Sequence, residues 1–282
     1  MKNIAAAVVL YNPDNEIIRN ISTYLNDVEK VYAVDNSDIL LDPELIKTLK
    51  SMPNLDYIPL QGNLGIAKAL NIAANRAIKE GFEFLLTMDH DSSASENMIQ
   101  DLYSIIIEYK DIGISAAQHY NPEIHTKPKE IITKDVQYTM ASGNLISLYA
   151  FQKIGGFNES LFIDHVDHEY CLRLKENGFR IIKTNKVLVI HRLGRAIVKK
   201  ILWFNLYPTN HSPIRVYYRT RNRLYICNKY KNIFPGYVKE DKKHFLRELL
   251  YISLAEKDIF NKFRMMYRGY KDYKKNKFGK IY

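Results

Sequence analysis

The sequence predicts an α/β fold in which a mostly parallel, Rossmann-like sheet is flanked by helices and followed by a basic helical region. Short apolar runs of strand length alternate with segments of helical periodicity through the first two thirds of the chain, which is the pattern of βα units. Polar and acidic residues follow several of these runs directly, and open α/β sheets bind their ligands at that edge. The last third of the chain is strongly basic.

The charge of the chain is divided unevenly along its length. Residues 192–282 hold 23 lysines and arginines against 6 aspartates and glutamates, whereas residues 1–191 hold 18 against 25. A basic C-terminal region suits nucleic acid, an anionic membrane or a phosphorylated substrate, and charge alone does not choose among these partners. We therefore expect a catalytic domain over residues 1–195 and a basic, helical region over residues 196–282.

The cysteines and the apolar runs favour a cytoplasmic location. Cys171 and Cys227 form neither a Cys-x-x-Cys pair nor a disulfide framework. No apolar stretch reaches the ~18 residues of a membrane span, and the first three residues lead into a strand-like run rather than a signal peptide. We expect a protein that is soluble or peripheral on the inner face of the cell membrane.

Three strands and their connections make up the expected N-terminal half of the sheet. Continuous apolar runs over residues 4–10, 31–34 and 55–60 predict strands, the first of them covered on both faces. The first run ends in the turn Tyr11-Asn12-Pro13 and the second in Asp35-Asn36-Ser37. Each strand therefore delivers polar groups to the same edge of the sheet.

A glycine-bearing loop and an alanine-rich helix over residues 66–79 follow the third strand. The N-terminus of this helix can hold a phosphate or a nucleotide edge, helped by Asn63, Lys68 and Asn71. A loop and a well-formed helix without any ligand explain the same residues equally well. The spacing is neither that of a Walker phosphate loop nor that of a dinucleotide fingerprint, so an ATPase or a dehydrogenase is not indicated.

The stretch EFLLTMDHD, residues 83–91, is the point around which the rest of the chain is arranged. An apolar run ends there in Asp89 and Asp91, which point to the same side of an extended chain. They can share a divalent cation, or divide a cation and a sugar between them, and carboxylates suit Mg²⁺ or Mn²⁺. Asp-x-Asp also occurs in ordinary surface turns, but such a turn does not need a hydrophobic strand before it.

The segment from residue 95 to residue 147 offers weaker signals. A helix around residues 95–109, capped by Ser95, and a strand over residues 112–117 are expected. Strand character returns over residues 138–147. The glycine in Ser142-Gly143-Asn144 indicates that the backbone there passes close to another group. The intervening residues 119–135 predict an irregular excursion or a hairpin.

A second acidic cluster lies at the start of the helix expected over residues 166–177. Asp164 and Asp167 fall at or just before its first turn, where the helix dipole favours an ionised carboxylate. Such a carboxylate can act as general base toward a sugar hydroxyl, although ordinary N-terminal helix charge is the simpler interpretation. Two histidines of this cluster and His191 raise the alternative of zinc, but no further spaced ligand completes such a site.

Taken together and in order, these motifs resemble those of the family 2 inverting glycosyltransferases. The segments that carry the resemblance are Val8-Val9-Leu10-Tyr11-Asn12-Pro13, Val34-Asp35-Asn36-Ser37, Gly62-Asn63-Leu64-Gly65 with Ala69 and Asn71, Asp89-His90-Asp91, Gly155-Gly156-Phe157, Asp167 ahead of Cys171-Leu172-Arg173, and His191-Arg192-Leu193-Gly194. The match covers residue 4 to about residue 230 and is most similar to bacterial rhamnosyltransferases that use dTDP-L-rhamnose. It implies a GT-A fold, a nucleotide-diphosphate sugar donor and a divalent metal, Mg²⁺ or Mn²⁺.

The resemblance also implies roles for single residues. Those expected at the donor nucleotide and sugar are Tyr11, Asn12, Asp35, Asn36, Asn63, Gly65, Lys68, Asn71 and Asp89. Asp91 is expected to bind the metal, with His191 as a second ligand from the far side of the cleft and Asp89 beside them. Asp167 is expected to be the catalytic base.

One departure from the family pattern affects the base. Many members have Glu-Asp where this chain has Val166-Asp167, so the assignment rests on the single acid Asp167. The surrounding Phe162-Ile163-Asp164-x-Val166-Asp167 is nonetheless similar to the rhamnosyl branch. The residues expected at the acceptor or at the diphosphate are Ser142, Gly143, Asn144, Asp164, Arg219 and Arg221.

The basic end of the chain predicts helices with charged faces. Residues 196–207 place Ile197, Ile201 and Phe204 on one helical face, and Arg215, Arg219 and Arg223 lie four apart on a stripe able to meet phosphates. From residue 259, apolar and aromatic residues recur at helical spacing among lysines and arginines. This basic amphipathic helix either binds an anionic membrane surface, packs on the catalytic domain or forms the seam of a homodimer.

Other classes of protein explain less of the sequence. A nucleotidyltransferase usually carries a Gly-rich, Arg-containing loop after its first strand, and Tyr11-Asn12-Pro13 has no glycine. A nucleic-acid-binding protein leaves the acidic edge unexplained, so we expect no nucleic acid partner. An inactive protein that binds a sugar nucleotide is an alternative function. UDP-galactofuranose and UDP-N-acetylhexosamines are alternative donors. The expected partners are a nucleotide-sugar donor and a glycan or lipid-linked acceptor of cell-wall or surface polysaccharide synthesis.

Overall fold

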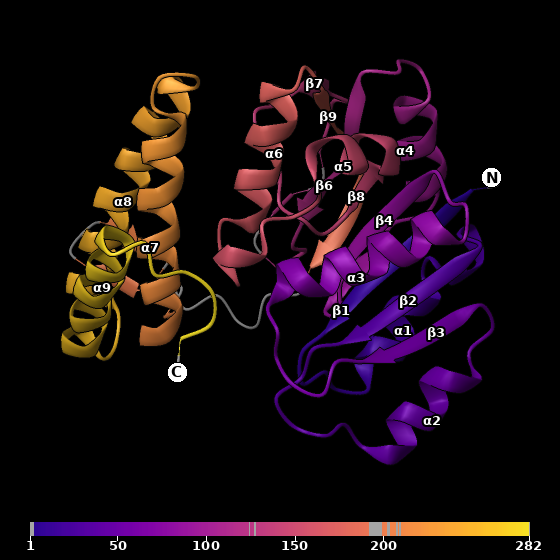
Figure 1. Ribbon diagram of the computed structural model, residues 1–282, viewed down its shortest axis with the longest axis horizontal. Coiled ribbons are helices and arrows are strands. Elements are labelled where there is room, and N and C mark those ends of the chain that lie inside the picture. Colours follow the sequence, from indigo (N-terminus) through magenta and orange to yellow (C-terminus); the bar gives the residue numbers. More distant parts are fainter. Residues whose placement is uncertain are drawn as a thin grey trace. The chain divides into compact units, whose positions relative to one another are not determined.

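The computed structural model describes residues 3–123, 125–126, 128–191, 199–201, 204–206, 208 and 210–281, and its elements are labelled in Figure 1. Contacts within the chain divide it into two compact units. The first comprises Met1–Glu159 and Asp167–Arg192, and the second Ser160–Val166 and Leu193–Tyr282. The chain therefore enters the second unit for a short segment immediately before Asp167 and returns to it after β9.

Four parallel strands form the first half of the sheet in unit 1, in the order β3-β2-β1-β4. Their bounds are Ile4–Leu10 for β1, Lys30–Asp35 for β2, Leu55–Pro59 for β3 and Phe84–Asp89 for β4. Every residue of β1 is buried, as expected for a continuous apolar run at the centre of a covered sheet. Helix α3 (Ile66–Lys79) packs on β1 and β2 (Figure 1).

The second half of the sheet is mixed in direction. Its strands are β5 (Ser92–Ala94), β6 (Ile112–Tyr120), β7 (Thr133–Asp135), β8 (Asn144–Ser147) and β9 (Arg180–His191). β8 lies antiparallel between β4 and β6, β6 pairs in parallel with β9, and β5 and β7 pair antiparallel with β9.

The α-helices of unit 1 lie between its strands along the chain. They are α1 (Glu16–Ser22), α2 (Pro43–Ser51), α3, α4 (Met98–Ile106), α5 (Leu148–Ile154) and α6 (Val166–Glu176). The expected cap of α4 at Ser95 is wrong, because β5 occupies the residues just before it and the helix begins at Met98. The Ser95 hydroxyl instead accepts a hydrogen bond from the backbone N–H of Leu188, at 2.9 Å.

The described residues of unit 2 after β9 form three α-helices and a short hairpin. Helices α7 (Pro213–Tyr230), α8 (Pro235–Ala255) and α9 (Ile259–Lys274) share an apolar core, to which Val216, Ile252 and Met266 contribute. A Cβ atom added at Gly269 of α9 would lie 2.7 Å from a backbone oxygen of α7, so this glycine permits the close crossing of the two helices. No helix among the described residues is long and apolar enough to span a membrane.

The helix expected over residues 196–207 is wrong for the part that the structure describes. Strands β10 (Lys199–Ile201) and β11 (Phe204–Leu206) pair antiparallel there. Apolar and aromatic residues fit a strand as well as a helix, so a short run of them does not decide between the two. The predicted helical-face residue Ile197 lies outside the described residues.

Lowering the pH is expected to destabilise unit 1 through His119 on β6. Burial lowers the pKa of His119 to about 4, with the charges of Lys183 and His191 adding to the effect. Between about pH 6.5 and pH 4 the unfolded chain takes up a proton that the folded chain does not, so the free energy of unfolding falls as the pH falls through this window. Above the window the contribution of His119 is fully present.

Urea unfolding at a series of pH values measures this dependence. His119→Phe is expected to flatten the slope of unfolding free energy against pH between pH 4 and pH 6.5. Equal slopes for the wild type and His119→Phe would show that His119 does not titrate with folding.

Candidate active site

The carboxyl ends of β1 and β2 present a set of polar groups held in place by one another. Asp35, at the end of β2, is 8% exposed, and its carboxylate accepts hydrogen bonds from the Ser37 N–H (3.0 Å) and the Tyr57 hydroxyl (2.5 Å). The Asn12 N–H, just after β1, donates to the Ser37 hydroxyl at 2.9 Å. The two strand ends are therefore joined across the edge at which a ligand is expected.

An amide network ties the loop before α3 to the same edge. The Asn36 side chain donates to the Asn63 side-chain oxygen (3.1 Å) and accepts from the Leu64 N–H (2.7 Å). Asn63 also accepts from the N–H of Gly65, whose φ of 93° at the start of α3 is a positive value that suits glycine. The half-exposed Tyr11 interacts with the Asn63 side chain and donates to the Asp38 carboxylate at 2.9 Å.

Lys68 and Asn71, also expected at the donor, are engaged elsewhere. The Lys68 ammonium pairs with the Glu159 carboxylate at 3.0 Å. Asn71 is 8% exposed; its amide donates to the Phe157 carbonyl and to Glu159, and accepts from the Phe157 N–H at 2.8 Å. Because a buried amide needs such partners, these residues serve to join α3 to the segment after α5.

Asp91 and His191 are in contact although they are a hundred residues apart in sequence. β5 pairs antiparallel with the end of β9 and sets Ser92 opposite His191. The His191 Nδ1 atom lies 3.2 Å from the Asp91 carboxylate and 3.0 Å from the Ser92 hydroxyl. The register of a three-residue strand therefore brings the two expected metal ligands together.

The charges of this cluster influence one another. Burial raises the pKa of Asp89 to about 6, with the charge of Asp91 as the next cause and that of Asp167 as a smaller one. Burial also opposes ionisation of Asp91, but the hydrogen bond and charge of His191 outweigh it, and the Asp91 pKa is lowered. The same hydrogen bond raises the pKa of His191. The cluster thus has an ionised carboxylate beside one that protonates more readily.

Asp91 and His191 fit a divalent cation as a pair of ligands. Their side chains are 48% and 20% exposed, which leaves the carboxylate accessible from solvent. A carboxylate oxygen suits Mg²⁺ and Mn²⁺, and the imidazole adds a second donor atom. Within the described ranges, no three His, Cys, Asp or Glu side chains are gathered as a complete metal site, so Asp89 does not complete a triad with the pair. Phosphate oxygens or water would supply the other ligands.

A polar cavity of about 450 Å³ opens beside Asp91. Its wall is formed by Asn12, Asp14, Glu16, Arg19, Asn20, Thr23, His90, Asp91, Ser93 and Ile190. The Asn20 side chain donates to the His90 carbonyl at 3.0 Å and so fixes the chain between β4 and β5. Asp91 is therefore reached from a space lined by hydrogen-bonding groups.

Asp167 lies in the first turn of α6. Its carboxylate accepts a hydrogen bond from the N–H of the next residue, His168, at 2.9 Å. Its charge contributes to the raised pKa of Asp89, which places the two carboxylates in the same electrostatic neighbourhood. A carboxylate in this neighbourhood can act as a general base toward a hydroxyl.

The family model for glycosyl transferase family 2 matches residues 6–166, more than half of the chain. The protein belongs to glycosyl transferase family 2. The chain is 29% identical to the dTDP-rhamnosyl transferase RfbF of Shigella flexneri over 248 residues, 80% of each chain. It is 25% identical over 212 residues to the low-salt glycan biosynthesis hexosyltransferase Agl10 of Haloferax volcanii, with 68% of this chain and 67% of that one covered.

Solved structures agree on the fold of this glycosyltransferase. S. aureus TarS residues 1–349, in complex with UDP-GlcNAc, has a TM-score of 0.58 at 18% identity, with 98% of this chain and 92% of that one covered. GalNAc-T7 with UDP, GalNAc and Mn²⁺ has a TM-score of 0.58 at 11% identity and covers 78% of this chain. The chain spans 40% of a longer TarS structure and 47% of GalNAc-T7. The GT-A-like fold is confirmed, with a mixed sheet and flanking helices.

In this glycosyltransferase, Ser142, Gly143 and Asn144 serve the packing of the sheet. A Cβ atom at Gly143 would lie 2.9 Å from Val189, so the close approach predicted from the sequence is to β9. The Ser142 hydroxyl accepts from the Asp89 N–H at 3.0 Å. Asn144 is 3% exposed and donates to the Met140 carbonyl. These contacts hold the end of β4 rather than offering a surface to an acceptor.

The arginines expected at phosphates are paired with acids or buried. Arg215, Arg219 and Arg223 form ion pairs with acids of their own unit, at 3.2 Å to Asp164, 3.5 Å to Glu248 and 3.0 Å to Asp241 respectively. Arg221 is 0% exposed and donates to backbone carbonyls. Spacing of four residues shows that side chains share a helix face, but it does not show which groups that face meets.

Several contacting residues carry no signal in the sequence. Tyr57, which holds Asp35, is a strand tyrosine like many others, and Glu159, which holds Lys68 and Asn71, begins a three-residue 3₁₀ helix (Glu159–Leu161) that no sequence pattern predicted. Ser92 follows Asp-x-Asp directly, and its position in the motif could have suggested a contact with the metal ligands.

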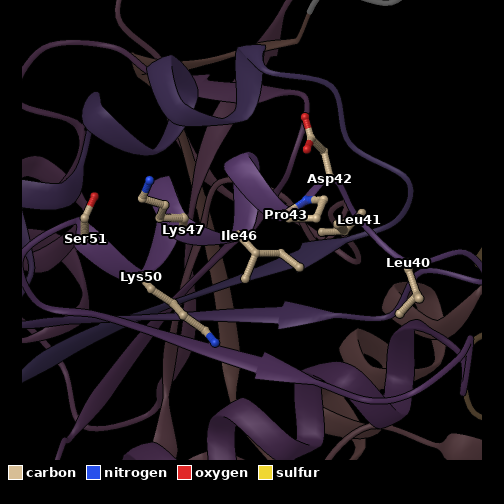
Figure 2. Close-up of a pocket in the computed structure, with 8 residues that line it drawn as sticks. All are labelled: Leu40, Leu41, Asp42, Pro43, Ile46, Lys47, Lys50 and Ser51. Atoms are coloured by element: carbon tan, nitrogen blue, oxygen red, sulfur yellow. The ribbon is translucent and has the colours of Figure 1, made fainter.

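A larger groove lies apart from these residues, on α2. It measures about 870 Å³ and is shown in Figure 2. The residues that line it are Leu40, Leu41, Asp42, Pro43, Ile46, Lys47, Lys50 and Ser51. The groove is mainly aliphatic, and Asp42 in it caps α2 by accepting from the Glu44 N–H. Its lining includes none of the residues predicted for the site.

Proposed function

We propose that the protein transfers L-rhamnose from dTDP-L-rhamnose to a hydroxyl of a lipid-linked precursor of a cell-surface polysaccharide, with inversion at the anomeric carbon. The observation that supports the proposal is the cluster at the end of β4, where Asp91 contacts His191 and where the charges of Asp91 and Asp167 both act on Asp89. The similarity to a dTDP-rhamnosyl transferase over 80% of both chains supports the choice of donor.

The proposed reaction is a single displacement. Asp167 accepts the proton of the acceptor hydroxyl while that oxygen attacks the anomeric carbon from the face opposite the diphosphate, and the bond to the diphosphate breaks. Tyr11, Asp35 and the Asn36–Asn63 amide pair are proposed to bind the nucleotide. Asp89 is proposed to bind a ribose or sugar hydroxyl. Asp91 and His191 would hold Mg²⁺ or Mn²⁺, which when bound offsets the charge of the diphosphate.

A second candidate keeps the mechanism but changes the donor. The solved structure of TarS with UDP-GlcNAc shares the fold over 98% of this chain, which favours testing UDP-sugars as well. At 18% identity it supports the fold alone. UDP-N-acetylhexosamines and UDP-galactofuranose are therefore the alternatives, and an inactive nucleotide-sugar binder is the alternative of another class.

Nucleotide release from a panel of sugar nucleotides tests the proposal. The panel contains dTDP-rhamnose, UDP-galactofuranose, UDP-N-acetylglucosamine and UDP-glucose, with Mn²⁺ or Mg²⁺ and then with EDTA. Release of dTDP from dTDP-rhamnose alone, abolished by EDTA, is the expected result. Release of UDP from a UDP-sugar would identify that sugar nucleotide as the donor and would leave the proposed mechanism unchanged. Neither release nor nucleotide binding, even after a lipid acceptor is added, would contradict the proposed function.

We also propose that α9 binds an anionic membrane surface, where a lipid-linked acceptor would be found. Met266 and Gly269 of α9 are buried, whereas Phe260 and Tyr267 on its other side are 80% and 61% exposed. Lysine ammonium groups lie over two exposed rings of this helix, Lys271 over Tyr267 at 5.1 Å and Lys274 over Tyr270 at 5.9 Å. An exposed aromatic face with basic residues around it is typical of helices that lie in the headgroup region.

Vesicle sedimentation tests the membrane proposal. The protein is expected to sediment with vesicles rich in anionic lipid at low salt and to remain in solution with neutral vesicles, because attraction to the anionic surface is part of the binding energy. Phe260→Ser with Tyr267→Ser is expected to reduce the bound fraction severalfold, while Leu40→Ser, which changes an even more exposed apolar residue of unit 1, is expected to leave it unchanged. Association without lipid in sedimentation velocity would instead indicate a homodimer seam.

A further inference from the structure

The segment immediately before Asp167 has an unusual backbone. Phe162, Asp164 and His165 have φ angles of 67°, 61° and 62°. Non-glycine residues seldom adopt this left-handed region, and a bulky residue such as phenylalanine does so least. Three such residues within four positions persist only where the surroundings fix them. The segment Ser160–Val166 belongs to unit 2, so those surroundings are the C-terminal helices.

Two adjacent side chains of α7 satisfy the carbonyl groups of this segment. The Asn222 amide donates to the carbonyls of Leu161 (2.9 Å), Ile163 (2.8 Å) and Asp164 (2.9 Å). The Arg221 guanidinium donates to the Leu161 carbonyl at 3.0 Å and also reaches the carbonyls of Ser160 and Gly279. Arg221 and Asn222 are both 0% exposed.

The buried guanidinium is also held on its other faces. Its centre lies 5.1–5.4 Å from the ring centroids of Tyr217, Tyr218 and Phe278. Tyr218 in turn stacks on Phe162, with ring centroids 5.0 Å apart. A buried charge is costly unless it is hydrogen-bonded, so Arg221 keeps its place only while these carbonyls stay where they are. The segment and the two side chains therefore fix one another.

We propose that Arg221 and Asn222 are positioning residues for the catalytic base: they fix the segment Ser160–Asp164, from which only two residues, His165 and Val166, lead to Asp167. The inference rests on the proposed function, because it takes Asp167 as the base. It replaces the phosphate contact expected for Arg221 from the sequence. The segment is joined to Asp167 by the continuous backbone, and a displacement of about 1 Å in a reacting group costs on the order of a hundredfold in rate.

Asn222→Leu is the first variant to measure, because it keeps the volume and removes the donated hydrogen bonds. We expect its kcat for rhamnosyl transfer to fall about tenfold or more, with the Kd for dTDP unchanged, since the nucleotide residues lie in unit 1. The control is Glu256→Gln, which weakens another buried pair of unit 2, Lys262–Glu256 at 2.7 Å, without touching the segment. It is expected to lower the melting temperature and leave kcat at the assay temperature unchanged.

A double-mutant cycle separates positioning of the base from a general loss of structure. If Asn222 acts through Asp167, then Asp167→Asn with Asn222→Leu is expected to be no slower than Asp167→Asn alone, within about threefold. Additive losses would overturn the proposal, as would a wild-type kcat in Asn222→Leu. A near-normal rate in Asp167→Asn would remove the base and contradict the proposed function itself.

Hydrogen exchange gives a readout that does not depend on activity. In Asn222→Leu, the backbone amides of residues 160–168 are expected to exchange faster than in the wild type, while those of β1 and β4 keep their protection. Unchanged exchange in residues 160–168 would show that Asn222 does not fix the segment, whatever the donor or the reaction proves to be.

Discussion

Asp167→Asn is expected to reduce transfer by two or more orders of magnitude while leaving nucleotide binding intact. A positioned general base contributes on the order of 10²–10⁴ in rate, and the amide cannot accept the proton of the acceptor hydroxyl. Volume and hydrogen-bonding shape are conserved, so the contact with the His168 N–H at the start of α6 can be kept through the amide oxygen. Transfer to an acceptor and equilibrium binding of dTDP measure the two effects separately.

The control for this variant comes from the same helix. Glu176→Gln changes an exposed acid at the far end of α6 and is expected to transfer at the wild-type rate. Equal rates for Asp167→Asn and Glu176→Gln would remove Asp167 from the reaction. A loss of dTDP binding in Asp167→Asn would assign the residue to the donor site instead.

The positions of the strand ends could be predicted because they depend on local pattern. The run before Asp89 is apolar and of strand length, and the structure ends β4 at that residue. Asp35, Asn36 and Asn63 likewise lie together at one edge, since successive parallel strands deliver their carboxyl ends there. The network that joins them, through Tyr57 and Ser37, depends on side-chain directions that periodicity does not contain.

Contacts between distant parts of the chain could not be derived from spacing. The meeting of Asp91 and His191 was implied by the family resemblance alone, because it depends on the register of β5 on β9. Lys68 was expected at a ligand because α3 begins beside the nucleotide edge, but its partner Glu159 lies ninety-one residues later, in a short 3₁₀ helix. A side chain near a helix N-terminus need not face the same direction as the terminal N–H groups.

In the basic region, the spacing of the charged residues likewise did not reveal their partners. A stripe of arginines on α7 predicted a phosphate contact, yet the acids that neutralise it lie on α8 and in the segment before α6. Paired arginines are a normal way to bury charge inside a helical unit. The amphipathic pattern of α9 was correct, but only the structure shows that Met266 faces inward while Phe260 and Tyr267 face out.

Asp91→Asn is expected to lower metal-stimulated transfer by about two orders of magnitude or more, because charge on the leaving diphosphate loses several kcal/mol of stabilisation when the cation is no longer held. The measurement is the rate of dTDP release as a function of Mn²⁺ concentration. A variant with one ligand removed binds the cation more weakly, so its rate should rise at higher Mn²⁺ concentration than that of the wild type. His191→Ala is expected to show the same shift.

The two ligand variants should act as one unit. If Asp91 and His191 hold the same cation, the double variant is expected to be little slower than either single variant. The cation is already lost when one ligand is removed, so removing the second has little further effect on the rate. Asp14→Asn is the matched control, because Asp14 lines the same cavity and its carboxylate accepts a local hydrogen bond from the Glu16 N–H. Two results together would contradict this role: a wild-type rate that EDTA does not change, and full activity in Asp91→Asn. Transfer would then proceed without a cation at this position, and the contact between Asp91 and His191 would serve only to stabilise the pairing of β5 with β9.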